Sequence, residues 1–189
     1  MGRDSGFVAA GAALASGDAN LVLIPEVRFS FDKLCQWLAG RLEKRGHAVI
    51  VVAEGAGQDV MAADAATDAS GNKLHGDIGV WLRDHLKTWF AERRLTLNIK
   101  YIDPSYTIRS SVANASDAVL CMRLGYNAVH AAMAGKTGCM VGLWNSHFTL
   151  VPIALTHGQR KKVDPGGAMW QTVLETTGQA SLREAPELA

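Results

Sequence analysis

The sequence predicts an α/β fold, a three-layer sandwich built around a mainly parallel sheet. Short apolar runs alternate with longer amphipathic stretches along the 189 residues, a rhythm that is typical of strand–helix–strand units. Residues 48–53 are apolar on both faces, as expected of a central parallel strand that is covered on both sides. Residues 77–92 carry large apolar side chains at helical spacing, which indicates an amphipathic helix.

The remaining elements follow from similar local patterns. Residues 5–16 are rich in alanine and end at Gly17, so they predict a helix. The run 21–24 stops at Pro25 and predicts a buried strand. Further helices are predicted over 31–45, over 111–134 (mostly buried) and near 167–176, and further strands over 95–101, 139–144 and 148–152.

The composition is that of a soluble globular protein, with 48% hydrophobic residues, 20% charged residues and a net charge of +1. This balance gives no field that would favour nucleic acid or an anionic membrane. No window reaches the roughly 18 apolar residues of a membrane span. Cys35, Cys121 and Cys139 are far apart in apolar runs, which predicts buried free thiols and a reducing, cytoplasmic location.

Useful side chains follow the predicted strands, which is where ligands bind in open parallel sheets. Glu54 follows the strand 48–53 and precedes Gly55 and Gly57. A carboxylate at this place can accept hydrogen bonds from two sugar hydroxyls, and the glycines allow a ligand to approach the backbone. The alternative is an exposed turn glutamate. Glu26 also ends a strand, and we expect it to be a structural acceptor for nearby backbone donors; the alternative is a residue that contacts the ligand.

A second group of polar side chains surrounds the end of the predicted strand 95–101. Lys100 ends this strand, and Tyr106 and Arg109 are three residues apart on a predicted helical turn, so they share a face. A phenol, a guanidinium and a nearby ammonium make a phosphate clamp. The alternative is a packed tyrosine beside a surface arginine.

Two kinds of catalytic feature are missing from the 189 residues. No glycine-rich phosphate loop joins a strand to a helix, and no pair of aspartates suits a general base beside a metal. The residues can therefore hold an anionic sugar phosphate, but they show no means of activating a hydroxyl or of holding a nucleotide.

Five ordered segments resemble the 6-phosphofructokinase family, specifically its long-sequence branch of ATP- or pyrophosphate-dependent enzymes. They are residues 1–7, 23–27, 51–58, 100–109 and 128–136, and the likeness extends to about residue 178. The resemblance implies that residues 1–178 are the C-terminal, fructose 6-phosphate-binding part of a phosphofructokinase-like domain and that residues 179–189 are a polar tail.

The same resemblance implies a set of residues around fructose 6-phosphate. The basic residue at the Lys100 position is usually arginine, and in the shorter bacterial members of the family it holds the 6-phosphate from a neighbouring subunit, so a homo-oligomer is expected. The implied reaction is phosphoryl transfer from ATP or pyrophosphate to O1 of the sugar, with Mg²⁺ on the donor phosphates. The implied substrate-binding residues are Met1, Gly2, Arg3, Glu54, Lys100, Tyr106 and Arg109.

The chain departs from the family in what precedes Met1-Gly2-Arg3. In the family, the donor-phosphate glycine loop and the catalytic aspartate lie upstream of this triplet, whereas here the triplet begins the chain. We therefore assign no catalytic or metal-binding residue, and expect a partial chain that is inactive alone. The alternatives are a non-catalytic sugar-phosphate-binding module that assembles with a separate partner chain, and an unrelated nucleotide-binding α/β domain.

Overall fold

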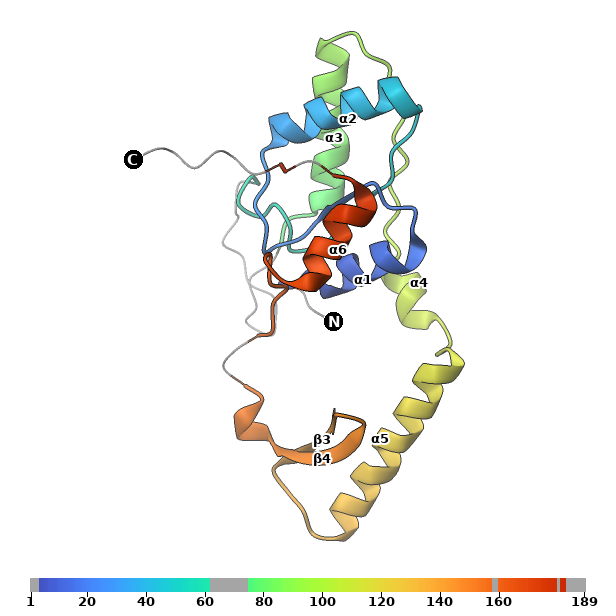
Figure 1. The fold of residues 1–189 in the computed structure, drawn as a ribbon, viewed down its shortest axis with the longest axis vertical. Helices are drawn as coiled ribbons and strands as arrows, with labels where there is room; N and C mark the ends of the chain where they lie inside the picture. The colour runs from blue at the N-terminus through green and yellow to red at the C-terminus, as the bar shows by residue number, and fades with distance from the viewer. Residues whose placement is uncertain (1–3, 62–74, 158–159, 180, 183–189) are drawn as a thin grey trace, which may run out of the picture. The chain divides into compact units, whose positions relative to one another are not determined.

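A computed structural model of the chain describes residues 4–61, 75–157, 160–179 and 181–182. The chain divides into two compact units, and Figure 1 shows their helices and strands. Unit 1 comprises Met1–Ile102 and Lys161–Ala189, and unit 2 comprises Asp103–Arg160. The boundary predicted at residue 178 stays a prediction, although two residues beyond it, Gln179 and Leu182, make contacts within unit 1 that are described below.

A parallel pair of strands lies at the centre of unit 1. Strand β1 (Leu21–Leu23) pairs with β2 (Ile50–Val52), with Leu21 opposite Ile50. Beyond the strand ends, the Ala53 N–H donates to the Leu23 carbonyl at 2.9 Å. The parallel α/β character is therefore confirmed. The prediction of β2 as a central strand is wrong for the described residues, because β1 is its one neighbour there.

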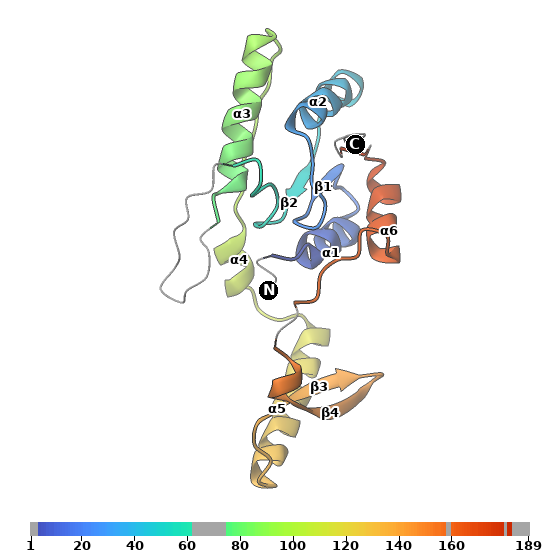
Figure 2. The ribbon, with the colours of Figure 1, turned by 90° about the vertical axis from the view of Figure 1, so that its left-hand side faces the viewer.

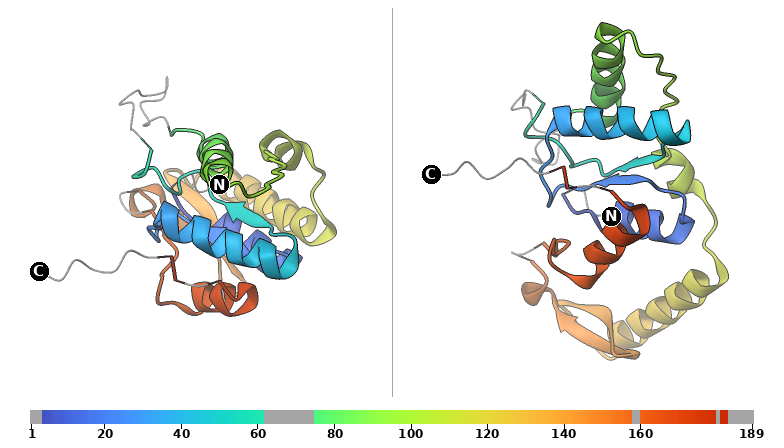
Figure 3. Two further views of the ribbon diagram at one scale, coloured as in Figure 1. Left: turned by 90° about the horizontal axis from the view of Figure 1, so that it is seen from above. Right: turned by 45° about the horizontal axis from the view of Figure 1, so that its top comes forward.

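Helices cover both faces of this strand pair, as Figures 2 and 3 show. Because side chains alternate along a strand, Leu21 and Leu23 pack into a cluster with one pair of helices, and Val22 and Ile24 pack with another pair. The first pair is α2 (Phe31–Arg45) and α3 (Ile78–Glu92); the second is α1 (Phe7–Ser16) and α6 (Ala168–Thr177). All four helices lie where the sequence predicts them.

The carboxylate of Glu26 joins three segments of unit 1. It accepts a hydrogen bond from the Gly6 N–H at 3.0 Å and another from the Val163 N–H at 2.9 Å. The first donor lies at the start of α1, the second lies shortly before α6, and Glu26 itself follows β1. This confirms the prediction that Glu26 is a structural acceptor.

Side chains beyond residue 178 also take part in unit 1. The Gln179 amide accepts from the Val22 N–H at 2.8 Å and donates to the Val22 carbonyl at 3.3 Å. The Leu182 carbonyl accepts from the Ser30 N–H at 2.9 Å, and the Leu182 side chain is buried. These contacts attach the segment that follows α6 to β1 and to the start of α2.

Unit 2 contains two helices, a hairpin and a short 3₁₀ turn. The hairpin strands β3 (Cys139–Trp144) and β4 (His147–Pro152) are antiparallel, so the expectation of a mainly parallel sheet is correct only for β1 and β2. Both residues of the hairpin turn have positive φ, 45° at Asn145 and 67° at Ser146, as in a type I′ turn. The other elements are α4 (Ser105–Ser110), α5 (Ala115–Met133) and η1 (Ile153–Leu155).

Two predicted elements differ from the structure. Residues 95–101 form no strand; instead Leu97 and Ile99 pack against the cluster of α2 and α3, so their alternation reflects side-chain packing and not strand pairing. Helix α5 is predicted to be mostly buried, but none of its residues is buried among the described ones. Its apolar composition is therefore no measure of burial within unit 2.

All three cysteines are free, as predicted, but only one of them is buried. Cys35 is buried, whereas Cys121 is exposed and Cys139 is partly exposed. Burial, reinforced by the nearby charge of Asp32, raises the pKa of the Cys35 thiol to about 12, so this thiol stays protonated and unreactive. In the part of the chain that the structure describes, no helix is both long enough and apolar enough to span a membrane.

Gly6 and Gly11 provide a matched test of the α1 packing. A Cβ at Gly6 would lie 2.5 Å from the Ile24 Cβ, whereas a Cβ at Gly11 would meet nothing within 4 Å. We expect Gly6→Ala to lower the free energy of unfolding by about 1–3 kcal/mol through overpacking. Gly11→Ala should raise it by about 0.5–1 kcal/mol, because alanine is the better helix former. Urea unfolding measures both, and equal stability of the two variants would contradict the packing described.

Candidate functional site

The carboxyl ends of β1 and β2 lie at the same edge of the strand pair, because the strands are parallel. Glu54 follows β2 at this edge and is exposed. The turn that carries it is closed by a hydrogen bond from the Ala56 N–H to the Ala53 carbonyl at 2.9 Å. Ala56 is fully buried, so the turn is anchored while the Glu54 side chain faces solvent.

Gly57 fits this turn against the core of unit 1. Its φ is +63°, and a Cβ at this position would lie 2.8 Å from the Ile78 Cδ1 and 3.0 Å from the Phe29 ring. The expectation that this glycine lets a ligand approach the backbone is therefore not what the structure shows. Gly57 serves close packing, and it fixes the turn that presents Glu54.

The side chain of Gln58 links the Glu54 turn to the segment before α3. Its Nε2 donates to the Glu54 carbonyl and to the Gly76 carbonyl, both at 3.1 Å. Its Oε1 accepts from the Gly76 N–H, also at 3.1 Å. Sequence reasoning did not single out Gln58, because no local spacing indicates a contact between residues 18 positions apart.

His75, the neighbour of Gly76, is joined to the start of the described chain. Its Nε2 lies 2.7 Å from Asp4 Oδ1, and its side chain is 11% exposed. The imidazole of His75 is therefore largely buried. Asp4 directly follows the predicted substrate residues Met1, Gly2 and Arg3, which lie outside the described residues.

Lys100 is exposed and lies in unit 1, at the end of the segment that packs along α3. The next residue, Tyr101, donates from its hydroxyl to Asp77 Oδ1 at 3.2 Å. The same Asp77 oxygen caps α3 by accepting from the Val80 N–H at 2.9 Å. This contact fixes the backbone beside Lys100 to the start of α3.

Tyr106 and Arg109 lie together in unit 2. Both are on the single short helix α4, three residues apart, and both are exposed. Tyr106 is 81% exposed, so the alternative of a packed tyrosine does not describe this helix. The structure thus brings these two residues onto one turn, while Glu54 and Lys100 belong to unit 1.

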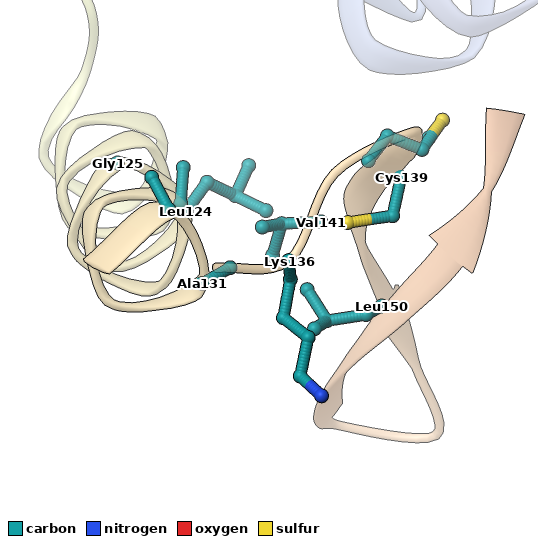
Figure 4. A pocket seen from close by; sticks show the side chains of 10 residues that line it. Leu124, Gly125, Ala131, Lys136, Cys139, Val141 and Leu150 are labelled. Carbon is teal, nitrogen blue, oxygen red and sulfur yellow. The ribbon is translucent and has the colours of Figure 1, made fainter. Parts of the chain in front are cut away.

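Unit 2 also contains a cavity of about 480 Å³ between α5 and the β3–β4 hairpin, seen closely in Figure 4. It is lined mainly by small and apolar residues such as Gly125, Ala131 and Val141. Lys136 and Cys139 are the polar residues of the lining. None of the predicted substrate-binding residues that the structure describes lines it, so we do not assign it to the predicted site.

No metal-binding residue is predicted from the sequence of this chain. Among the described residues, no three His, Cys, Asp or Glu side chains lie close enough together to hold a metal ion.

The amino-acid sequence of the chain matches one protein family. A family model described as phosphofructokinase matches residues 1–132. The chain is 47% identical to an ATP-dependent 6-phosphofructokinase of Borreliella burgdorferi, over 95% of this chain and 42% of that protein. It is 48% identical to an ATP-dependent 6-phosphofructokinase of Amycolatopsis methanolica, over 95% of this chain and 41% of that protein.

A plant relative gives the same result. The chain is 47% identical to the ATP-dependent 6-phosphofructokinase 5, chloroplastic, of Arabidopsis thaliana, over 95% of this chain and 34% of the relative. The chain thus spans about two fifths or less of the length of these three relatives. The family model reaches into both units, since residues 1–132 include most of unit 1, all of α4 and all but the last residue of α5. On these grounds the chain belongs to the phosphofructokinase family.

Proposed function

We propose that this chain supplies the sugar-phosphate site of a 6-phosphofructokinase, which transfers a phosphoryl group to O1 of fructose 6-phosphate. The observation that carries this proposal is the identity of 47–48% to three enzymes named ATP-dependent 6-phosphofructokinase, over 95% of the chain. Those names favour ATP over pyrophosphate as the donor, a choice that the sequence alone leaves open.

Each proposed substrate residue has a distinct role. The exposed carboxylate of Glu54 accepts hydrogen bonds from sugar hydroxyls. Arg109 and Tyr106, one turn apart on α4, hold the 6-phosphate through charge-assisted and hydroxyl hydrogen bonds, and Lys100 adds a positive charge. Met1, Gly2 and Arg3, which lie outside the described residues, are proposed as further contacts to the sugar. Together these contacts fix O1 for attack, which is how enzymes of phosphoryl transfer obtain much of their rate.

The donor side of the reaction is proposed to lie outside the residues described. Mg²⁺ would accompany the donor phosphates and neutralise charge there, and we assign it no ligand in this chain. The helices on both faces of β1 and β2 support a three-layer sandwich, in which further strands would extend the two-stranded core. We also propose a cytoplasmic homo-oligomer, because Lys100 matches a position that reaches a neighbouring subunit in related enzymes.

Arg109 provides the first test, in a phosphofructokinase of the relatives' length that contains this chain. We expect Arg109→Ala to raise the half-saturating concentration of fructose 6-phosphate roughly 10- to 150-fold, because a charge-assisted contact contributes about 1.5–3 kcal/mol. Arg109→Lys should recover only part of the loss, since lysine keeps the charge but not the planar fork. Steady-state kinetics with each substrate varied in turn measures this, and half-saturation by ATP should change little.

Arg123 is the matched control, because it is an arginine of the same unit whose guanidinium lies over the Phe148 ring at 4.6 Å. Arg123→Ala should leave saturation by fructose 6-phosphate unchanged. Equal weakening of donor and acceptor by Arg109→Ala would contradict the assignment of Arg109 to the sugar phosphate.

The 189-residue chain by itself provides the second test. We expect it to bind fructose 6-phosphate and to show no phosphoryl transfer with ATP or pyrophosphate in a coupled assay, because its residues offer no donor-phosphate loop and no general base. Turnover that Glu54→Ala abolishes would contradict this expectation. Turnover that arises only on mixing with a separately encoded chain would instead favour a binding module that assembles with a partner.

A further inference from the structure

We propose that His75 and Gln58 are positioning residues that hold the Glu54 turn of unit 1 in place relative to the start of the described chain. This inference rests on the proposed function and deepens it. Neither residue is among the predicted substrate contacts. Both act through the segment His75–Gly76, which is bonded on one side to Asp4 and on the other to the Glu54 turn.

The first link runs from this segment to the beginning of the chain. His75 Nε2 lies 2.7 Å from Asp4 Oδ1, and the histidine side chain is 11% exposed. The Asp4 side chain is 38% exposed, and a hydrogen bond to a carboxylate is stronger than one between neutral groups. The link thus fixes the His75–Gly76 segment to Asp4, so that this segment is a firm support for whatever else it binds.

The second link runs from the same segment to the turn after β2. The Gln58 amide makes three hydrogen bonds of 3.1 Å, two with Gly76 and one with the Glu54 carbonyl. The amide thereby uses both its donor and its acceptor groups, which fixes its orientation. The Glu54 backbone cannot shift relative to Gly76 without breaking these bonds, so the carboxylate is presented from a fixed point.

Two buried polar atoms beside these links support a role beyond packing. Ser5 Oγ and His75 Nδ1 have no hydrogen-bond partner among the described residues. Buried polar atoms in proteins are nearly always paired. A polar ligand or water at this place would satisfy them, and both atoms belong to the Asp4–Ser5 and His75–Gly76 segments that the network joins.

The test uses fructose 6-phosphate titrated into the 189-residue chain by calorimetry, with thermal unfolding of each variant. We expect Gln58→Met and His75→Phe each to weaken binding about tenfold, which is about 1.4 kcal/mol. His75→Gln can still donate to Asp4, so it should bind within about threefold of the wild type. His75→Phe and Asp4→Ala each remove one partner of the same hydrogen bond. The double variant should therefore bind fructose 6-phosphate no more weakly than the single variant that binds it less well.

Gln179→Met is the matched control. The side-chain amide of Gln179 also forms hydrogen bonds with a backbone N–H and a backbone carbonyl of unit 1. Both of these groups belong to Val22, in the middle of β1. We expect Gln179→Met to lower the melting temperature while the affinity for fructose 6-phosphate stays unchanged. The control therefore distinguishes a loss of affinity caused by mispositioning from one caused by lower stability of the fold.

The outcomes distinguish the two proposals. If the wild type binds and Arg109→Ala weakens binding, but Gln58→Met and His75→Phe bind as the wild type does, the positioning role is overturned and the proposed function stands. If Gln58→Met, His75→Phe and Gln179→Met all lose affinity in proportion to their melting temperature, the network is only structural. Absence of wild-type binding would overturn the proposed function and this inference together.

Discussion

The architecture of unit 1 depends on one carboxylate, that of Glu26. It follows β1 and accepts from the Gly6 N–H and the Val163 N–H, so it joins the start of α1 to the segment before α6. Backbone N–H groups in partly buried positions need such acceptors. The close approach of Gly6 to Ile24 completes the junction, because any larger residue would separate α1 from the strand. This junction lies beside the apolar cluster in which α1 and α6 pack with Val22 and Ile24.

On the opposite face of the strand pair, the constraint is the close packing of the Glu54 turn against the core. Gly57 lies against Ile78 and Phe29 without room for a Cβ, and Gln58 ties the turn to Gly76. An exposed carboxylate is thus carried on an anchored backbone. Preorganised positioning of this kind is what a binding site requires, because a flexible side chain on a flexible loop loses more entropy when it binds.

Unit 2 combines a firmly specified hairpin with apolar side chains that face solvent. The two-residue turn at Asn145 and Ser146 sets the register of β3 and β4. Helix α5, by contrast, exposes Met122, Tyr126 and Met133. The pattern of apolar residues predicted the helix correctly, while the number of apolar residues gave a wrong expectation of its burial.

Local patterns determined most of the secondary structure and the chemistry of the candidate site. Helical spacing and strand-like runs are set by neighbouring residues, so α2, α3, β1 and β2 follow from the sequence, as does the pairing of Tyr106 with Arg109 on one turn. The role of Glu26 as an acceptor also followed from its place after a strand. Tertiary structure alone decided that residues 95–101 pack as an extended segment without pairing, that Gly57 is needed for packing, and that His75 meets Asp4. These contacts join residues far apart in the chain, and their energies depend on which surfaces meet, which no local spacing records.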